Sequence, residues 1–533
     1  MNKYTLLALS VSGGILSGLA WTDWCPGFVL FVSFVPFLLV ENHLFENQRK
    51  YSSASFFTYL LPGFVIFSIM TFGWVRAVSI PAAICVILMA SLLMSFTLWL
   101  AHIIILKAGT ISGSVSFIAF WLTLELLCLN MDVLSPWANL GSGLSKDILF
   151  IQWYEVTGVA GGTLWILASN LFLTFSMLSL FKKRKTMFPV IWLIVVIIPS
   201  GASLIRYGSI KPSVGRESEV VIVQPDYDPY TEKFTIPFEE QLNKAAGMAE
   251  TMLTNNTCWL VLPETIVDDP VNENNLAEDK YIRILKGLIN RHPGLNVVAG
   301  METYKPYQPL TESATPGSIS GSLNPAFTHY FNSAINIDSG PSVQIYHKSK
   351  LVPGFETGFT SGPLRLVKKL LPEPGGNRWG YEPQKERSCF TDDIQSQKIA
   401  PVICYESIYG EYVTDYIKEG AEAIFVITND GWWKNTNGYK QHFAHSSMRA
   451  IETRRPLVRS ANTGISGIID IRGRVIQKSD WWTPTVLKGV FSPETRITVY
   501  VRYGDYLMYM AAVVTILIIL MVFVYLPFRD RLR

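Results

Sequence analysis

The sequence predicts a polytopic α-helical membrane domain of about eight spans, joined to a soluble α/β domain. Of the 533 residues, 49% are hydrophobic and only 16% are charged, which is too apolar for an ordinary soluble protein. The charge is also uneven, because residues 1–205 hold 17 of the 87 Asp, Glu, Lys and Arg residues. After residue 206, short apolar strands alternate with helical patterns, which is typical of an α/β domain.

Eight segments are candidate membrane spans, since a helix needs roughly 20 apolar residues to cross a bilayer. They are residues 4–22, 26–40, 55–75, 80–106, 112–129, 163–181, 187–205 and 506–528. The first is expected to be a retained helix rather than a signal peptide, because further spans follow it. We therefore expect a transmembrane domain of about seven helices over 1–205, a soluble domain over 206–505, and a C-terminal transmembrane helix with a basic tail over 506–533.

Basic residues predict the orientation of the membrane part, because the Lys and Arg residues of short loops stay in the cytoplasm. With the N-terminus inside, eight spans place five basic pieces on the cytoplasmic side: Lys3, the loop 49–50, Lys107, the cluster 182–185 and the tail 529–533. The same arrangement places the domain 206–505 and the loop 130–162 outside the cytoplasm.

Two features of the membrane part have no settled function. The loop 130–162 contains SPWANLGSG and QWYEVTGVAG, and it is either a membrane-interface loop with aromatic anchors or a platform that positions a lipid. Glu125 lies within the apolar run WLTLELLCL, where an ionisable group is costly and usually has a partner. Because Glu125 is one turn from the predicted end of its span, it is close enough to reach the interface, and the sequence assigns it no role.

Composition also excludes some function classes. The net charge of +3 is small and no basic stripe with interleaved aromatic residues is present, so nucleic acid is not an expected partner. The six cysteines form no C-x-x-C pair, so no metal site is expected. Cys25, Cys85 and Cys128 lie in or beside apolar segments and are expected to be small core residues. Cys258 and Cys389 share the soluble domain, and the sequence leaves open whether they form a disulfide.

Buried strands are predicted over residues 219–225, 258–264, 295–300, 334–337, 399–406 and 423–430. Helices are predicted over 239–253 and 280–291. Residues 303–328 and 357–388 are expected to be long loops, the second with a short amphipathic helix in LRLVKKLLP.

Reactive side chains stand at the ends of three predicted strands. Glu264 ends CWLVLPE, Lys348 lies in YHKSKLVPGFE, and Cys404 ends IAPVICYE. Active sites of open α/β sheets gather at the carboxyl ends of strands. A thiol nucleophile needs a base to form the thiolate and a fixed positive charge to stabilise the oxyanion, and Glu and Lys supply these two roles.

These residues carry a resemblance to the nitrilase superfamily. The segments LVLPE, YHKSKLVPGFE, PVICYESIYG, TNDGWWKNTNGYKQHFAHSSMRAIETRRPLVRSANTG and TVYVRYGD, set among eight spans, closely resemble the apolipoprotein N-acyltransferase family, the membrane-bound branch of that superfamily. The resemblance covers nearly the whole chain and implies that the soluble domain is an αββα sandwich. Soluble nitrilases and amidases share the triad but lack the spans and TVYVRYGD.

The resemblance implies roles for individual residues. Glu264 matches the general base, Cys404 the nucleophile and Lys348 the cation over the tetrahedral intermediate. The motif also contains Lys350, but the family pattern places the catalytic lysine three residues before Leu351, which selects Lys348. Glu356 matches a further active-site Glu.

Other residues of the matching stretches are expected to support the site. Tyr405 and Glu406 match the pair that follows the nucleophile, either as chemical groups or as structural support. Phe234, Trp432 and Asn429 are possible substrate or lid residues.

Two positions depart from the family pattern. Gly354-Phe355 reverses the usual Phe-Gly, and Phe234 replaces a family Trp. We expect both departures to alter the packing of the lid rather than to abolish activity. His442 is expected to be a hydrogen-bonded core group, and Arg454-Arg455 a solvated or lipid-headgroup contact.

The function that the resemblance implies is ping-pong acyl transfer. A phospholipid is the expected acyl donor, the diacylglyceryl-cysteine amine of an apolipoprotein is the acceptor, and no cofactor or metal is needed. The expected location is a bacterial inner membrane, with the catalytic domain in the periplasm. The alternatives are a membrane-tethered nitrilase or amidase, and a transporter or scaffold. A transporter would require ionised residues in mid-span, and Glu125 is the one that the sequence indicates.

Overall fold

The computed structural model describes residues 1–131, 135–211, 213, 217–306, 328–357 and 380–525. The chain divides into two compact units. Unit 1 consists of residues 1–210 together with 503–533, and unit 2 consists of residues 211–502.

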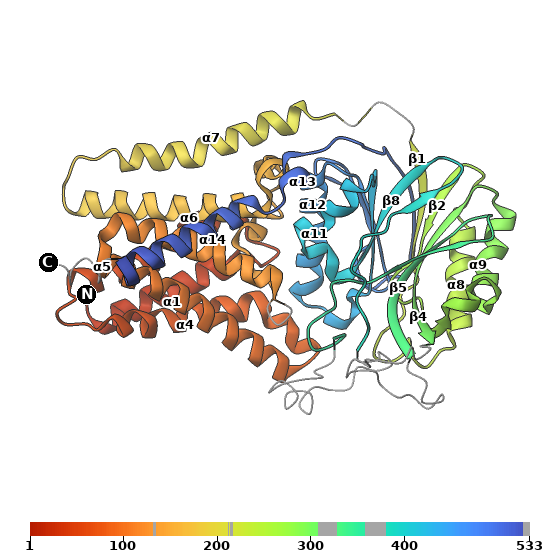
Figure 1. Ribbon diagram of the computed structural model, residues 1–533, viewed down its shortest axis with the longest axis horizontal. Coiled ribbons are helices and arrows are strands. Elements are labelled where there is room, and N and C mark those ends of the chain that lie inside the picture. The colour runs from red at the N-terminus through yellow and green to blue at the C-terminus, as the bar shows by residue number, and fades with distance from the viewer. Residues whose placement is uncertain (132–134, 212, 214–216, 307–327, 358–379, 526–533) are drawn as a thin grey trace. The chain divides into compact units, whose positions relative to one another are not determined.

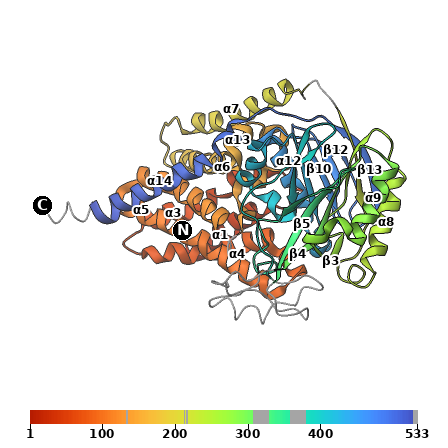
Figure 2. The same cartoon turned by 45° about the vertical axis from the view of Figure 1, so that its right-hand side comes forward.

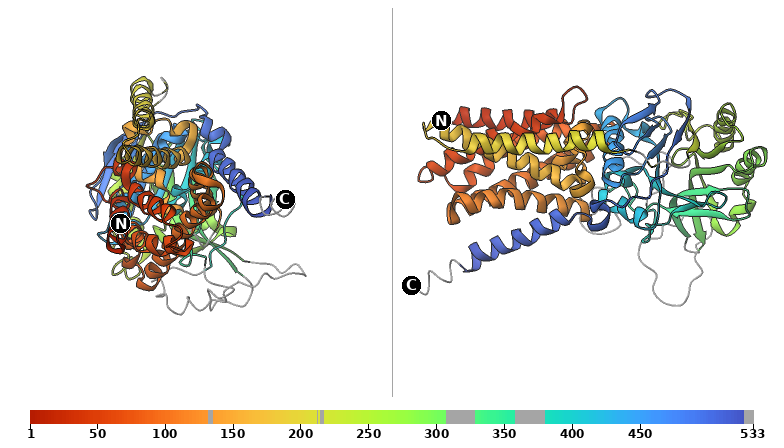
Figure 3. Two further views of the ribbon diagram at one scale, coloured as in Figure 1. Left: turned by 90° about the vertical axis from the view of Figure 1, so that its left-hand side faces the viewer. Right: turned by 90° about the horizontal axis from the view of Figure 1, so that it is seen from above.

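Unit 1 is helical. Its α-helices are α1 (Lys3–Leu19), α2 (Leu30–Ser33), α3 (Val35–Glu46), α4 (Ser53–Phe72), α5 (Ile80–Asn130), α6 (Tyr154–Phe181), α7 (Phe188–Ser209) and α14 (Tyr506–Leu520). Short turns of tighter helix are η1 (Gly27–Val29), η2 (Gly73–Ala77), η3 (Pro136–Ala138), η4 (Leu140–Leu144) and η5 (Ile148–Phe150), and a π-helical turn, η9 (Met521–Tyr525), follows α14. Most of the long helices run side by side, as Figure 3 shows.

The described residues contain six helical segments that are long and apolar enough to cross a membrane: Gly27–Glu46, Ser53–Ala77, Ile80–Asn130, Tyr154–Phe181, Phe188–Ser209 and Tyr506–Val524. The predicted membrane domain is confirmed, but its count of eight spans is not. Helix α1 is only 17 residues long. The predicted spans 80–106 and 112–129 form one 51-residue element, interrupted at Gly109, whose φ of 84° and ψ of 174° suit a residue without a Cβ atom.

The segment 130–162, predicted as a loop, forms helical turns and the start of a helix in much of its described part. Helix α6 begins at Tyr154, nine residues before the predicted span, and the turns η3 and η4 are buried within unit 1. Close approach explains the glycines: a Cβ atom on Gly141 would lie 2.1 Å from the carbonyl oxygen of Val159. The segment is therefore part of the packed interior of this unit.

Glu125 lies in the interior of the same unit. Its carboxylate is buried and accepts hydrogen bonds from Trp121 Nε1 at 3.1 Å, from the backbone N–H of Leu140 at 2.7 Å and from Thr163 Oγ1 at 2.8 Å. The burial is satisfied because three donors replace water. Glu125 thus fastens η4 to helices α5 and α6.

A second ionisable group lies within a predicted span. His102 of the span 80–106 contacts Glu41 of α3, with 3.0 Å between Nδ1 and Oε1, and both side chains are largely buried. Glu125 is therefore not the single ionisable residue within the predicted spans. His102 and Glu41 pair with each other, which is the expected arrangement for ionisable groups among apolar helices.

Unit 2 contains two β-sheets. Its strands are β1 (Ser218–Gln224), β2 (Thr257–Val261), β3 (Val267–Asn272), β4 (Asn296–Pro306), β5 (Thr328–Ile337), β6 (Val343–His347), β7 (Phe390–Asp392), β8 (Gln397–Ile403), β9 (Ala423–Thr428), β10 (Leu457–Ala461), β11 (Gly467–Ile469), β12 (Val475–Lys478) and β13 (Thr485–Phe491). Its helices are α8 (Phe238–Glu250), α9 (Lys280–Arg291), α11 (Gly410–Lys418), α12 (Asn437–Thr453) and α13 (Val499–Tyr503), with short turns η6 (Glu273–Glu278), η7 (Cys404–Ile408) and η8 (Asp430–Trp433).

The six predicted strands and two predicted helices of this unit are present, with bounds shifted by a few residues. Strand β4 continues to Pro306, so the loop predicted from residue 303 begins later. The amphipathic helix predicted in LRLVKKLLP lies outside the described residues. Cys258 and Cys389 are free thiols rather than a disulfide.

The strands form two sheets in the orders β13-β1-β2-β4-β5-β6, with β3 paired to β4, and β12-β11-β10-β9-β8-β7. Within the first sheet β1, β2 and β4 are parallel, and within the second β8, β9 and β10 are parallel. The sheets pack face to face: the Trp259 ring on β2 lies 5.3 Å from the Phe425 ring on β9, and Ser460 Oγ on β10 donates to the carbonyl of Val223 on β1 at 2.9 Å.

Helices cover the outer faces of the two sheets. Apolar residues of α8 and α9, among them Leu242, Leu285 and Leu288, pack on the first sheet, and the views in Figures 1 and 2 show both helices on that side. Helices α11 and α12 lie against the second sheet in Figure 1. The order helix, sheet, sheet, helix confirms the predicted αββα sandwich.

Candidate active site

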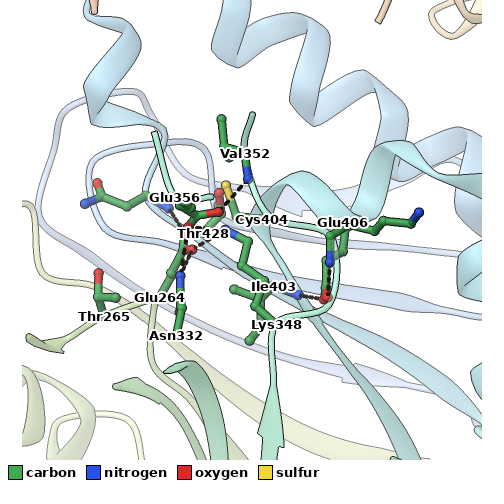
Figure 4. Close-up of polar contacts among 12 residues, drawn as sticks. Glu264, Thr265, Asn332, Lys348, Val352, Glu356, Ile403, Cys404, Glu406 and Thr428 are labelled. Carbon is green, nitrogen blue, oxygen red and sulfur yellow. Dashed lines mark hydrogen bonds and ion pairs between the residues drawn. The ribbon is translucent and has the colours of Figure 1, made fainter. Parts of the chain in front are cut away.

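Three strand ends of unit 2 bring the predicted reactive groups together. Glu264 follows β2 by three residues, Lys348 follows β6 directly, and Cys404 follows β8 directly. Strand β6 is antiparallel to β5, which is antiparallel to β4, so β6 runs in the same direction as β2 and ends at the same edge. Figure 4 shows the side chains of all three residues converging.

Lys348 lies between two carboxylates. Its Nζ is 2.9 Å from Glu264 Oε1 and 2.8 Å from Glu356 Oε1. Asn332 on β5 donates from Nδ2 to the same two oxygens, at 2.9 Å and 3.1 Å. A backbone group also contacts Glu264: the N–H of Asn429 donates to its Oε2 at 3.2 Å. All these groups are buried, so the carboxylates and the ammonium are fixed relative to one another.

Lys350, the other lysine of this motif, points elsewhere. Its Nζ lies 5.0 Å from the centre of the Tyr409 ring. Because β6 ends at His347 and the chain bends at residues 349–350, the two lysines do not share one face, and Lys348 alone of the two contacts the carboxylates.

Cys404 occupies a strained turn. Its φ is 49°, in the left-handed region that residues with a Cβ atom seldom adopt, and it begins the helical turn η7. The thiol is buried beside the side chain of Thr428 and close to Glu264 and Lys348 (Figure 4). A sharp turn directly after a strand presents the side chain at the sheet edge, in the manner of nucleophiles on strand-to-helix turns.

Burial and charge set the protonation states of these groups. Burial raises the pKa of the Cys404 thiol and the charge of Glu264 adds to the rise, while Lys348 opposes it. Burial also favours the neutral form of Glu264, but the charge and hydrogen bond of Lys348 outweigh it and hold the pKa of this carboxyl below its ordinary value. Burial disfavours the Lys348 ammonium, yet Glu264 and Glu356 raise its pKa well above the ordinary value. At neutral pH the site therefore holds a neutral thiol beside a carboxylate and an ammonium.

Glu406 ties two of the reactive segments together. Its Oε2 accepts the backbone N–H of Ile403 at 2.8 Å, next to the cysteine, and its Oε1 accepts the backbone N–H of Ser349 at 2.6 Å, next to the lysine. The hydroxyls of Tyr346 and Tyr412 also donate to Oε1, each at 2.6 Å. These contacts favour structural support over chemistry for Glu406.

The other predicted residues make contacts of different kinds. The ring of Tyr405 lies 5.4 Å from that of Tyr409. Phe234 and Trp432 are half-buried and stack with 6.2 Å between their ring centres. Asn429 reaches the site through its backbone, while its Oδ1 accepts from Asn462 Nδ2 at 3.2 Å.

Asn332 and Lys233 are among the residues at this site that the sequence does not predict. Asn332 lies within β5, and an inward-facing Asn in a strand has no local signal that distinguishes it from a core polar residue. Lys233 is buried and donates from Nζ to Thr265 Oγ1 at 2.5 Å; burial lowers its pKa, against the charges of Asp268 and Glu264. The sequence predicts its neighbour Phe234 as a possible substrate or lid residue, and nothing in the sequence indicates that Lys233 is buried.

An αββα sandwich that gathers a carboxylate, an ammonium and a thiol at its strand ends defines an enzyme of the nitrilase class. Residues 220–497 match the model of the carbon-nitrogen hydrolase family, and residues 13–172 match that of the apolipoprotein N-acyltransferase N-terminal domain. The chain therefore belongs to the carbon-nitrogen hydrolase family, in its membrane-bound apolipoprotein N-acyltransferase branch.

Individual relatives match along most of the chain. The apolipoprotein N-acyltransferase of Chlorobaculum tepidum is 26% identical over 511 residues, which cover 93% of this chain and 92% of that protein. That of Geobacter metallireducens is 26% identical over 524 residues, covering 94% and 90%. Among solved structures, a nitrilase-superfamily protein of Saccharomyces cerevisiae has a TM-score of 0.37 and 14% identity, covering 53% of this chain and 93% of that one. With its apolar helices and these relatives, the protein is a membrane-bound acyltransferase.

Proposed function

We propose that this protein transfers an acyl chain from a phospholipid to the N-terminal amine of the diacylglyceryl-cysteine of an apolipoprotein, through a thioester on Cys404. The observation that carries the proposal is the joint presence in one chain of membrane-crossing helices and a buried Glu–Lys–Cys cluster, matched along most of the chain by N-acyltransferases. Both substrates are lipids, so an active site on a membrane-anchored domain suits them.

In the first half-reaction, Glu264 takes the proton of the Cys404 thiol as the sulfur attacks the ester carbonyl of the phospholipid. The pKa directions support this order, because Glu264 is ionised at rest and the thiol is not. The carbonyl oxygen becomes an oxyanion. Lys348 has three N–H donors, and among the described residues Glu264 and Glu356 accept two of them, which leaves one donor for the oxyanion.

When the tetrahedral intermediate collapses, the C–O bond of the ester breaks and the proton held by Glu264 passes to the leaving oxygen. The products are a lysophospholipid and the Cys404 thioester. In the second half-reaction, the lipoprotein amine attacks the thioester carbonyl and Glu264 takes a proton from the nitrogen. The C–S bond breaks, the amide forms, and the proton returns to the cysteine sulfur.

The alternative is a membrane-tethered nitrilase or amidase that hydrolyses a small carbon–nitrogen substrate. It would use the same three residues, but a single helix would suffice as its anchor. The N-terminal residues 13–172 match an acyltransferase domain rather than a bare anchor, which favours acyl transfer.

The test is acyl transfer in proteoliposomes made with a phospholipid labelled on its acyl chain. Without acceptor, the wild-type protein should gain a hydroxylamine-sensitive label on Cys404. Addition of a diacylglyceryl-cysteine peptide should move the label to the peptide amine as an amide, seen by mass spectrometry. Cys404→Ser is the control and should gain no thioester. Label of equal intensity on the Ser variant, or release of free fatty acid instead of the amide, would contradict the proposal.

We also propose that the protein lies in the bacterial inner membrane with residues 206–505 in the periplasm, supported by the Lys182–Lys185 cluster, which is expected to stay in the cytoplasm. Single cysteines introduced at Arg184 and at the exposed Ile394 provide the test. A membrane-impermeant thiol reagent should label position 394 but not position 184 in intact spheroplasts, measured above the labelling of the parent protein. The reverse pattern would refute this orientation.

A further inference from the structure

A buried polar cluster lies behind the turn that carries Cys404 and has no part in the proton transfers described above. We call it the carbonyl cluster, and it consists of Ser407, Asp430, His442 and Arg459. The four side chains come from η7, η8, α12 and β10, and each residue is fully buried. Burying four polar side chains costs free energy, and only specific contacts among them can offset this cost.

Two members of the carbonyl cluster converge on one backbone atom, the carbonyl oxygen of Cys404. Ser407 Oγ donates to this oxygen at 2.7 Å. His442 Nε2 lies 3.1 Å from the same oxygen and 2.9 Å from Ser407 Oγ. The carbonyl belongs to a residue with a φ of 49°, so the contacts act on the strained peptide that orients the thiol. Such strain persists only where surrounding contacts over-determine the conformation.

The other contacts of His442 assign its ring proton. Its Nδ1 lies 2.9 Å from Arg459 Nη2, which can only donate, so Nδ1 accepts there. Asp430 Oδ1 also lies 2.9 Å from Nδ1 and accepts from Thr428 Oγ1 at 2.8 Å, and its Oδ2 accepts from Arg459 at 2.7 Å. Burial and the charge of Arg459 lower the pKa of His442 and favour a neutral ring with a single proton. The Cys404 carbonyl oxygen, 3.1 Å from Nε2, can only accept, so we place this proton on Nε2, where it donates to the carbonyl.

We propose that His442 is a positioning residue for the nucleophile: its Nε2–H, together with the Ser407 hydroxyl, fixes the Cys404 carbonyl and so aims the thiol at Glu264 and Lys348. The inference rests on the proposed role of Cys404 as the acyl-accepting nucleophile. It differs from a role in proton transfer, because the ring contacts the backbone of Cys404 and Glu264 supplies the base. Small displacements of a reacting atom cost on the order of a hundredfold in rate.

Two substitutions of His442 separate the loss of the donor to the Cys404 carbonyl from the loss of side-chain volume. In His442→Gln the amide nitrogen can take the place of Nε2 and keep the donor to the carbonyl. In His442→Asn the shorter amide can reach only the place of Nδ1, so the contacts with Asp430 and Arg459 remain but the donor is lost. Ser407→Ala removes the second donor without changing the ring.

The experiment measures single-turnover thioester formation on the full-length protein in proteoliposomes with acyl-labelled phospholipid, as a function of pH. We expect the plateau rate of His442→Asn to fall on the order of a hundredfold, that of Ser407→Ala by about tenfold, and that of His442→Gln to stay within about threefold of wild type. The pH midpoint should be the same in all variants, because Glu264 remains the base.

Several results would overturn the inference. They are a wild-type rate in His442→Asn, a rate in His442→Gln as low as in His442→Asn at equal unfolding temperature, or a shifted pH midpoint. Should His442→Asn fail to fold, Ser407→Ala decides, and an unchanged rate there would refute the positioning role. Label on wild-type protein at a residue other than Cys404 would instead refute the proposed function, so the two failures are distinguishable.

Discussion

Lys348→Met should abolish acylation, while Lys350→Met should leave it nearly unchanged. Lys348 is 1% exposed and holds two carboxylates within 3 Å, so methionine leaves Glu264 and Glu356 buried without their cation. Breaking a buried ion pair costs about 3–5 kcal/mol of stability. The loss of the donor to the oxyanion costs about 3 kcal/mol of transition-state stabilisation, on the order of a hundredfold in rate. One carboxyl must also become protonated, which removes part of the base, so we expect a loss on the order of a thousandfold.

The assay is single-turnover thioester formation, with the unfolding temperature measured on the same samples. Lys350→Met is the matched control, because the contact of its ammonium with the Tyr409 ring is worth only about 0.5–1 kcal/mol. The double variant Lys348→Met/Glu356→Gln separates stability from chemistry. Removing one carboxylate should recover most of the lost stability and the part of the rate lost through protonation of the base, but not the roughly hundredfold lost with the oxyanion donor. Normal acylation by Lys348→Met, or full recovery of the rate in the double variant, would refute the assignment of this lysine.

Three further predictions concern the supports of the fold. Cys404→Gly should be more stable than Cys404→Ala by about 1 kcal/mol, because glycine adopts the φ of 49° without strain; equal unfolding temperatures would contradict this. Burial alone would raise the pKa of Glu273, but the hydrogen bond and charge of His347 lower it to about 2, so Glu273→Gln should lose up to about 3 kcal/mol at pH 7. This difference should shrink as the pH falls from 4.5 toward 2, and a constant difference would argue against the ion pair. Glu125→Ala should lose at least about 3 kcal/mol in detergent and Glu125→Gln less, since the amide oxygen can still accept the Leu140 N–H; equal losses would contradict the hydrogen-bond argument.

The strands that position the site can be predicted from the sequence because each is a local signal. Short, mostly apolar strands are enough to place Glu264, Lys348 and Cys404 at strand ends, which in the structure belong to two different sheets. The choice of Lys348 over Lys350 follows from the register of the family motif, which places the catalytic lysine three residues before Leu351. In the structure the chosen lysine faces the two carboxylates.

For some residues long-range packing decides an environment that the sequence does not predict. Arg454 and Arg455 are predicted to be a solvated or lipid-headgroup contact, yet both are buried: Arg454 donates to the carbonyl of Ile471 at 2.8 Å and Arg455 to that of Ala421 at 2.7 Å. A guanidinium satisfied by backbone carbonyls leaves no pattern in its own neighbourhood of the sequence. The buried environment of Glu125 is also set by distant residues, because two of its three donors come from segments 15 and 38 residues away.

The strained turns at the site show why its supporting groups cannot be recognised in the sequence. Asp226, Thr265 and Cys404 follow β1, β2 and β8, and each has a positive φ that costs on the order of 1–3 kcal/mol. Each turn has a further buried contact: the N–H of Asp226 donates to the carbonyl of Asn462, the Thr265 hydroxyl accepts from Lys233, and the Cys404 carbonyl accepts from Ser407 beside a histidine of α12. Reactive side chains can be recognised by their strands, but these contacts form only in the folded domain. Sensitivity to substitution should therefore extend from the three reactive residues to these buried groups.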